Sequence, residues 1–321
     1  MTPRVFIDGD VGTVGLQIRT RLEGRTDLEL IALPDSERKD RARRADMLNA
    51  ADLAILCLPD DMARKAVALV DNPDKRIIDA STAYRVDPEW VFGFPEMTPE
   101  QSSKISAAKR VSNPGCYATG AIALLRPLVA KGVVPPDHGI HIHGVSGYSG
   151  GGRKLIESFE NPGADDPISS AYYVYGLALN HKHVLEIATE SLLAKKPLFV
   201  PSVGRFRQGM IVQVPLHLKG LTGTLQPGDV HAVFKEWYAG QTHVEVAPLV
   251  NDLKAGRLDP EDLNGTNTLR LHVFGESEAG LVLLAAQFDN LGKGAAGQAI
   301  QNLNLMLGFN KDAGITEQFT A

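Results

Sequence analysis

The sequence predicts an α/β protein, in which a Rossmann-like, doubly wound parallel sheet is joined to a second α+β domain with a mixed, largely antiparallel sheet. Two observations carry this prediction. Up to residue 115, short apolar runs alternate with segments whose apolar residues recur at helical spacing, which is typical of βαβ units. Beyond that point apolar and polar residues alternate within most strand-like runs, as expected where only one face of a sheet is covered, and residues 280–288 form a more continuous apolar run.

The first part of the chain contains four expected strands. They are the apolar runs 4–8, 28–33, 51–58 and 76–80. Helical spacing follows the first run at Val14, Ile18 and Leu22, and it returns over residues 40–50 and 61–70. Because helical segments separate these strands, we expect successive strands to be parallel.

The rest of the chain begins with a long apolar helix over residues 116–130. Four strands are expected after it, at 140–143, 210–217, 268–274 and 280–288. A final helical pattern over 294–307 is isolated from other elements, so we expect that helix to pack back on the protein.

Composition excludes several classes of protein. The chain has 321 residues, two cysteines and a formal net charge of −5. So few cysteines exclude a disulfide scaffold and fit a reducing compartment, and no apolar run approaches the ~20 residues of a membrane span. The N-terminus has no secretory apolar region, and the one basic stretch, ERKDRARR, is short. We therefore expect a cytoplasmic protein that binds neither a membrane nor nucleic acid.

A glycine-rich turn, GDVGTVG, follows the first expected strand. Such a turn lets the backbone approach a pyrophosphate, whose charge is stabilised by the start of the next helix. The GxxGxxG spacing differs from the usual GxGxxG, so the position after the first strand favours dinucleotide binding over an ordinary strand-to-helix turn. The expected phosphate-binding residues are Gly9, Gly12, Thr13, Val14 and Gly15.

The residues after the second expected strand allow either NAD or NADP as the dinucleotide. Asp35 lies 20 residues after Gly15, where an acidic group would bind the ribose hydroxyls of NAD. Ser36 and Arg38, with Lys39 beyond them, could instead hold the 2′-phosphate of NADP. These cations could also be a solvated helix start, and the residues favour NADP only slightly.

Cys116 is the candidate nucleophile. Pro114 and Gly115 force a turn, and the apolar run from Tyr117 makes Cys116 the first or N-cap residue of a long helix. The helix N-terminus favours a thiolate and offers N–H groups for an oxyanion. The alternative is a buried structural cysteine, which is how we interpret Cys57 within the apolar run 51–58.

Histidines supply candidates for the acid and base. His181 and His183 flank Lys182 at an expected helix start, where one of them could act on the substrate or either could be an ordinary helix-terminal residue. His141 and His143 share one face of an expected strand, but further ligands are lacking, so no metal site is expected.

Four further motifs, in order along the chain, carry a family resemblance. They are SNPGCYATG, GVSGYSGGGRK, HKH and NLGKGAAGQA. With the glycine turn they closely resemble the N-acetyl-gamma-glutamyl-phosphate reductases, in their shorter form, within the semialdehyde dehydrogenase superfamily. The motifs span residues 9 to about 309, which is essentially the whole chain.

The resemblance implies NADP(H)-dependent reduction of N-acetyl-L-glutamyl 5-phosphate to the 5-semialdehyde and phosphate, in arginine biosynthesis. Cys116 would form a thioester with the acyl group, and His183 would be the acid/base, with His181 as the alternate or a substrate contact. The implied cofactor contacts, besides the glycine turn, are Ser36, Arg38, Pro59, Ser146, Gly147 and Asn290. The implied substrate contacts are Arg85, Asn113, Arg153 and Lys154.

The resemblance also implies domain limits. A dinucleotide-binding domain over residues 1–115 would be completed by a C-terminal helix at 290–321, and residues 116–289 would form the catalytic, substrate-binding and oligomerisation domain of a homodimer or homotetramer.

Two alternative functions remain. Aspartate-semialdehyde dehydrogenases share the architecture, but their asparagine-cysteine-threonine centre is replaced here by Gly115-Cys116-Tyr117. A non-catalytic NADP sensor would need the glycine turn but not Cys116.

Overall fold

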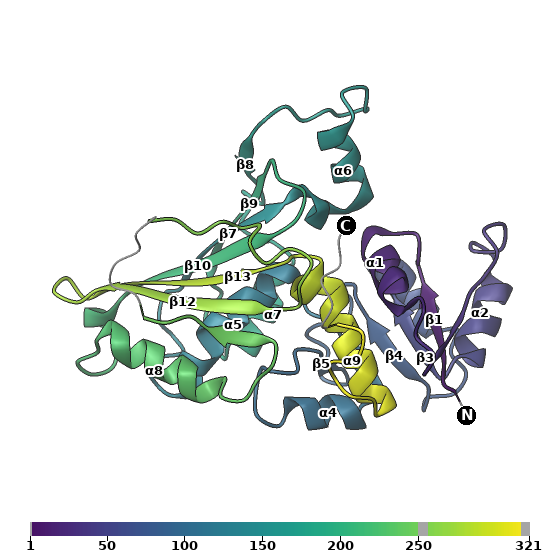
Figure 1. The fold of residues 1–321 in the computed structure, drawn as a ribbon, viewed down its shortest axis with the longest axis horizontal. Helices are drawn as coiled ribbons and strands as arrows, with labels where there is room; N and C mark the ends of the chain where they lie inside the picture. The colour runs from purple at the N-terminus through teal and green to yellow at the C-terminus, as the bar shows by residue number, and fades with distance from the viewer. Residues whose placement is uncertain (1, 250–255, 316–321) are drawn as a thin grey trace. The chain divides into compact units, whose positions relative to one another are not determined.

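The computed structural model describes residues 2–249 and 256–315 (Figure 1). The described chain divides into two compact units. The first contains residues 2–95, 99–115 and 295–315, and the second contains residues 96–98, 116–249 and 256–294. The second unit therefore includes a three-residue segment whose sequence neighbours on both sides belong to the first.

The first unit is built on a six-stranded sheet with the order β2-β1-β3-β4-β6-β5, in which all strand pairs are parallel. Its strands are β1 (Arg4–Asp8), β2 (Glu29–Ile31), β3 (Leu53–Leu56), β4 (Arg76–Asp79), β5 (Val91–Phe92) and β6 (Arg110–Ser112). The four expected strands are present: the first has the predicted bounds, and the other three are shorter than expected. Strand order reverses beside β1, and in such sheets ligands bind beyond the carboxyl ends of the strands at the reversal.

Helices cover both faces of this sheet. They are α1 (Thr13–Leu22), α2 (Arg41–Ala50), α3 (Asp60–Val67), α4 (Gln101–Ala107) and α9 (Gly297–Leu307). Successive residues of β1 enter opposite cores: Val5 packs in the cluster with α1, α4 and α9, and Phe6 in the cluster with α2 and α3. The centre of the strand, Val5–Ile7, is apolar because both of its faces are buried.

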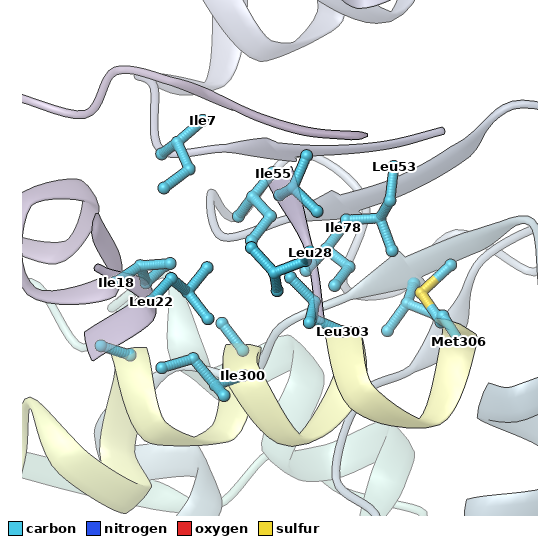
Figure 2. Packing of buried hydrophobic residues seen from close by; sticks show 14 of the residues in the cluster. Ile7, Ile18, Leu22, Leu28, Leu53, Ile55, Ile78, Ile300, Leu303 and Met306 are labelled. Carbon is cyan, nitrogen blue, oxygen red and sulfur yellow. The ribbon is translucent and has the colours of Figure 1, made fainter. Parts of the chain in front are cut away.

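The C-terminal helix α9 belongs to the core of the first unit. Figure 2 shows Ile300, Leu303 and Met306 on α9 facing strand residues such as Ile55 and Ile78. The helical pattern at the end of the chain therefore has its apolar partner in elements more than 200 residues earlier.

The second unit contains a seven-stranded mixed sheet with the order β11-β12-β13-β10-β7-β9-β8. Its strands are β7 (His141–Gly147), β8 (Tyr172–Val174), β9 (Leu198–Gly204), β10 (Met210–His217), β11 (Val244–Val246), β12 (Leu269–Glu276) and β13 (Leu281–Phe288). Only β7–β9 and β11–β12 are parallel among its pairs in the described chain. The predicted fold class is confirmed.

Helix α5 (Cys116–Ala130) packs against β10 and β13 and against two other helices. The other helices of this unit are α6 (Gly152–Glu160), α7 (His183–Glu190) and α8 (Pro227–Trp237), with short turns η1 (Tyr148–Gly151) and η2 (Leu218–Gly220). A π-helical turn, η3 (Gly292–Ala296), precedes α9. Across residues 2–249 and 256–315, no helix combines the length and the apolar character that crossing a bilayer requires.

Candidate active site

The glycine turn brings the start of α1 against the end of β1. Gly9 has a φ of +95°, and a Cβ there would lie 2.4 Å from the carbonyl oxygen of Cys57. A Cβ on Gly15 would lie 2.2 Å from the carbonyl oxygen of Gly9. Gly12 is the N-cap and has no capping side chain, so the N–H groups of the first turn, which begins at Thr13 and Val14, can bind an anion.

A cavity of about 780 Å³ opens beside this turn, within the first unit. Its lining includes Gly9, Asp10 and Val11 from the turn, and Asp35 and Arg38 from the segment after β2. The volume and the mixed apolar and charged lining suit part of a dinucleotide. Ser36 and Pro59 are exposed and are not among the lining residues.

The charged residues at the mouth of the cavity form a network. Arg38 Nη2 lies 3.0 Å from Oδ1 of Asp35 and 3.5 Å from Oδ2 of Asp10, and Arg19 Nη1 lies 3.1 Å from the same Asp10 oxygen. From the sequence, the Asp35 carboxylate was a candidate to bind the ribose hydroxyls of NAD. In the structure Arg38 pairs with this carboxylate, so the negative charge of Asp35 is balanced and does not oppose a 2′-phosphate. Asp10 is a residue of the turn that sequence reasoning missed.

Arg85 and Asn113 are neighbours at the carboxyl ends of β4 and β6. Arg85 Nε donates to the carbonyl oxygen of Asn113 at 3.0 Å, and the Asn113 N–H donates to the carbonyl oxygen of Asp79 at 2.7 Å. Burial raises the pKa of the Asp79 carboxyl to about 6, against the opposing effect of its hydrogen bond from Ser81. The two predicted substrate contacts Arg85 and Asn113 are thus buried near the Asp79 carboxyl.

Cys116 is the first residue of α5, as predicted; it is half-buried and forms no disulfide. Tyr175 lies close to it: burial first, and then the charge of Cys116, raise the pKa of the Tyr175 hydroxyl. Burial likewise raises the pKa of Tyr117 well above its usual value. Tyr117 Oη donates to the carbonyl oxygen of Ser202 at 2.7 Å, which anchors the residue next to Cys116.

His181 lies among aromatic rings near the start of α7. Its ring centroid is 4.7 Å from that of His183, 5.1 Å from that of Phe199 and 5.7 Å from that of Tyr175. Tyr175 Oη lies 3.5 Å from its Nε2. Because Tyr175 also lies near Cys116, it connects the candidate nucleophile to this histidine.

His183 is buried and faces an acidic side chain. Its Nε2 lies 3.9 Å from Oε1 of Glu186, whose side chain is 1% exposed. Both side chains lie on α7, three residues apart, and both are buried. Glu186 was missed from the sequence, although its spacing of three residues on a helix is a recognisable signal. Tyr175 has no recognisable sequence signal. It follows β8 directly, and the pairing of β8 with β9 brings it to the site.

Ser146, Gly147 and Asn290 come together in the second unit. Asn290 Oδ1 accepts from the Gly209 N–H at 2.7 Å and its Nδ2 donates to Ser149 Oγ at 3.0 Å, so its amide already has two protein partners. The Gly147 N–H donates to the carbonyl oxygen of Gly209 at 2.9 Å, which joins the same loop.

Two other predicted substrate contacts, Arg153 and Lys154, are exposed on α6. The structure links neither to the cluster around Cys116. In the described part of the chain, no group of three or more histidine, cysteine or acidic side chains is arranged to hold a metal ion.

The prediction that Cys57 lies inside a strand is wrong. Strand β3 ends at Leu56, and Cys57 is half-buried in the segment that faces the glycine turn. Burial, followed by the charges of Asp79, Asp8 and Asp10, raises the pKa of its thiol. Its apolar sequence context did not show that the strand ends one residue earlier, where the chain turns toward α3.

Comparisons with known proteins define the class. The family model of the semialdehyde dehydrogenase NAD-binding domain matches residues 4–105, and that of the semialdehyde dehydrogenase dimerisation domain matches residues 116–290. A solved aspartate semialdehyde dehydrogenase II from Vibrio cholerae has a TM-score of 0.71 at 15% identity over 96% of this chain and 99% of that one. One from Francisella tularensis has a TM-score of 0.71 at 13% identity, over 95% and 100%. At these identities the likeness shows the fold.

Curated relatives narrow the class. N-acetyl-gamma-glutamyl-phosphate reductase 2 of Pseudomonas putida is 54% identical over 96% of this chain and 97% of its own. The N-acetyl-gamma-glutamyl-phosphate reductase of Burkholderia ambifaria is 55% identical, over 95% and 96%. The chain belongs to the N-acetyl-gamma-glutamyl-phosphate reductases of the semialdehyde dehydrogenase family.

Proposed function

We propose that this protein reduces N-acetyl-L-glutamyl 5-phosphate to N-acetyl-L-glutamate 5-semialdehyde and phosphate, as a step of arginine biosynthesis. The observation that carries the proposal is the half-buried Cys116 at the start of α5, with Tyr175, His181 and His183 in the same unit. The names of relatives at 54–55% identity over nearly the whole chain support the substrate.

The chemistry begins at Cys116. Its thiolate attacks the acyl carbon, the bond from that carbon to the phosphate oxygen breaks, and phosphate leaves with the bonding electrons. The product is a thioester on Sγ, so one difficult step becomes two easier ones. The N–H groups at the start of α5 are suited to stabilise the oxyanion that forms during attack.

NADPH, when bound, supplies the hydride that reduces the thioester carbon. The alkoxide that develops on the substrate oxygen needs a proton, and the same proton must leave when the thiohemiacetal collapses to aldehyde and thiolate. We assign this transfer to His183, because its buried imidazole faces the Glu186 carboxylate, with Nε2 3.9 Å from Oε1. His181 is the alternate, or holds the substrate.

The cofactor contacts are proposals of the same kind. The first turn of α1, with Gly9, Gly12 and Gly15, fits the pyrophosphate, and Arg38 beside the 780 Å³ cavity fits the 2′-phosphate. Ser146, Gly147 and Asn290 remain candidates for the nicotinamide. The donors Arg85, Asn113, Arg153 and Lys154 are proposed for the carboxylate and phosphate of the substrate.

Two measurements test the proposal: the substrate preference of the protein and the turnover of the variant Cys116→Ser. The assay is run in reverse, with phosphate, NADP and either N-acetylglutamate semialdehyde or aspartate semialdehyde, and absorbance is followed at 340 nm. We expect reaction only with the acetylglutamyl compound, and Cys116→Ser is expected to lose turnover by a factor of about 10³ or more while binding NADPH normally. Full turnover by Cys116→Ser, or preference for aspartate semialdehyde, overturns the proposal.

We further propose a homodimer or homotetramer in the cytoplasm. The dimerisation-domain description of the family model over residues 116–290 supports the assembly. Two cysteines that form no disulfide and the use of NADPH support a reducing compartment. Sedimentation at micromolar concentration tests the assembly, and a monomer contradicts it.

A further inference from the structure

One buried ion pair lies in a segment that contacts Cys116 and has no part in the proposed reaction. Lys293 Nζ lies 2.6 Å from Oε2 of Glu96, and both side chains are fully buried. Lys293 belongs to the π-helical turn Gly292–Ala296. Glu96 belongs to the segment 96–98, which is part of the second unit although it is flanked by the first.

The residue after Lys293 touches the candidate nucleophile. A Cβ on Gly294 would lie 3.0 Å from Cβ of Cys116 and 3.3 Å from the Phe288 ring. The Gly294 N–H donates to the carbonyl oxygen of Asp289 at 3.0 Å. The backbone of Gly294 therefore packs directly on the Cys116 side chain, and any shift of the turn moves that contact.

The partner of Lys293 is tied to α5, the helix that begins with Cys116. Trp237 of α8 donates from Nε1 to the carbonyl oxygen of Met97, next to Glu96, at 3.2 Å. Burial first, and then the charge of Glu96, raise the pKa of Tyr238, whose Oη donates to the carbonyl oxygen of Ala123 in α5 at 2.9 Å. Glu96 thus lies on a framework built from α5 and α8, and through Lys293 it connects this framework to the turn.

We propose that the Glu96–Lys293 pair is a positioning element for the nucleophile: it fixes the turn Gly292–Ala296 so that the backbone of Gly294 holds the Cys116 side chain in its reactive orientation. The proposal rests on the function proposed for Cys116. Desolvation makes a buried ion pair a weak source of stability, and apolar residues of similar volume can often replace one. π-Helical turns are frequent at functional sites, which agrees with a positioning role.

The test measures the reactivity of the Cys116 thiol directly. The full chain carries Cys57→Ala, so that iodoacetamide modifies one thiol, and its alkylation rate is followed from pH 5 to pH 10. The double variant Glu96→Gln/Lys293→Met removes both charges and keeps similar volumes. We expect the midpoint of the alkylation profile to rise by about one pH unit and kcat to fall about tenfold, with KM for NADPH changed less than about twofold.

A matched control separates positioning from loss of stability. Arg126→Met removes an ion pair that starts from α5, in which Nη1 of Arg126 lies 3.5 Å from Oε2 of Glu190 at the end of α7. It is expected to lower Tm while the alkylation midpoint stays where it was. Gly294→Ala, with the ion pair intact, is expected to move the midpoint as the double variant does, because its methyl group would press on Cys116.

Two results overturn the proposal. One is a double variant with unchanged midpoint and kcat, whatever its Tm. If the double variant does not fold, Gly294→Ala decides, and an unchanged alkylation profile in that variant overturns the proposal. Retained turnover in Cys116→Ser is a separate result, which overturns the proposed function and not the contact between Gly294 and the thiol.

Discussion

The backbone N–H of His183 donates a hydrogen bond to Nδ1 of His181 at 3.2 Å. Since Nδ1 accepts this bond, the proton of a neutral His181 lies on Nε2, the atom 3.5 Å from the hydroxyl oxygen of Tyr175. The start of α7 thus selects the tautomer of His181, and Tyr175 faces its proton.

Removal of the Tyr175 hydroxyl tests this arrangement. Tyr175→Phe is expected to lower kcat about three- to tenfold, because one orienting hydrogen bond is worth about 1 kcal/mol, with KM for NADPH unchanged. Tyr173→Phe is the control, since Tyr173 lies on β8 and its ring centroid is 6.4 Å from that of Tyr175. Equal kcat values in the two variants would contradict a role for Tyr175.

The two histidines can be separated by substitution. His183→Asn is expected to lower kcat by about 10²–10³, because it removes the proposed proton donor beside Glu186. His181→Asn is expected to lose less in kcat and more in KM for the acyl phosphate. Steady-state kinetics on both variants checks this assignment, and the reverse order of kcat losses would transfer the acid/base role to His181.

Thiol reactivity distinguishes the two cysteines. The pKa of Cys57 is raised by burial and by nearby carboxylates, so iodoacetamide at pH 8 is expected to modify Cys116 alone. Cys57→Ala is expected to lower the free energy of unfolding by about 1 kcal/mol and to leave kcat unchanged. Peptide mass mapping after alkylation shows which of the two cysteines carries the label. Modification of Cys57 at a rate similar to that of Cys116 would disprove it.

Arg38 is expected to decide coenzyme preference. Arg38→Leu should weaken binding of 2′,5′-ADP by about 10- to 50-fold and binding of ADP by about twofold or less, since only the former carries the 2′-phosphate. Titration calorimetry with both nucleotides measures this. Arg43→Leu is the matched control, because Arg43 pairs with Glu37 at 2.7 Å on the exposed side of the same segment. Equal weakening of both nucleotides by Arg38→Leu would contradict the assignment.

Asp79 makes stability depend on pH. Its pKa is about 6 in the folded protein against 3.8 for an ordinary aspartate, so the folded state binds the proton more tightly. The resulting stability is fully present below about pH 3.8 and is lost as the pH rises through 6. Between pH 5 and pH 7.5 this loss amounts to about 1.4 kcal/mol. Urea unfolding of Asp79→Asn should lack that component, and an identical pH dependence in both proteins would refute it.

The periodic elements were predictable, and the short ones were not. The helix expected over residues 116–130 is observed as Cys116–Ala130, because its apolar run is long and a proline-glycine turn precedes it. Strands β5 (Val91–Phe92) and β8 (Tyr172–Val174) have two and three residues, too few to show a period. Their positions depend on pairing with β6 and β9, which local patterns cannot express.

The same distinction applies to the site. Cys116, the glycine turn and the two histidines lie at element ends that have sequence signals. Tyr175 and Glu96 do not, because their relevance arises from contacts with residues far away in the chain. The role of Arg38 was predicted only in part, since its link to Asp10 joins two loops 28 residues apart.

The packing of α9 in the first unit has a consequence for synthesis on the ribosome. Strands β1 to β6 emerge first, but Ile300, Leu303 and Met306 emerge only after the whole second unit has been made. At translation rates of ~5–20 residues per second, one apolar face of the nascent sheet waits roughly 10 to 35 seconds for its cover. Until then, the nascent sheet lacks the apolar contacts through which α9 buries Ile55 and Ile78.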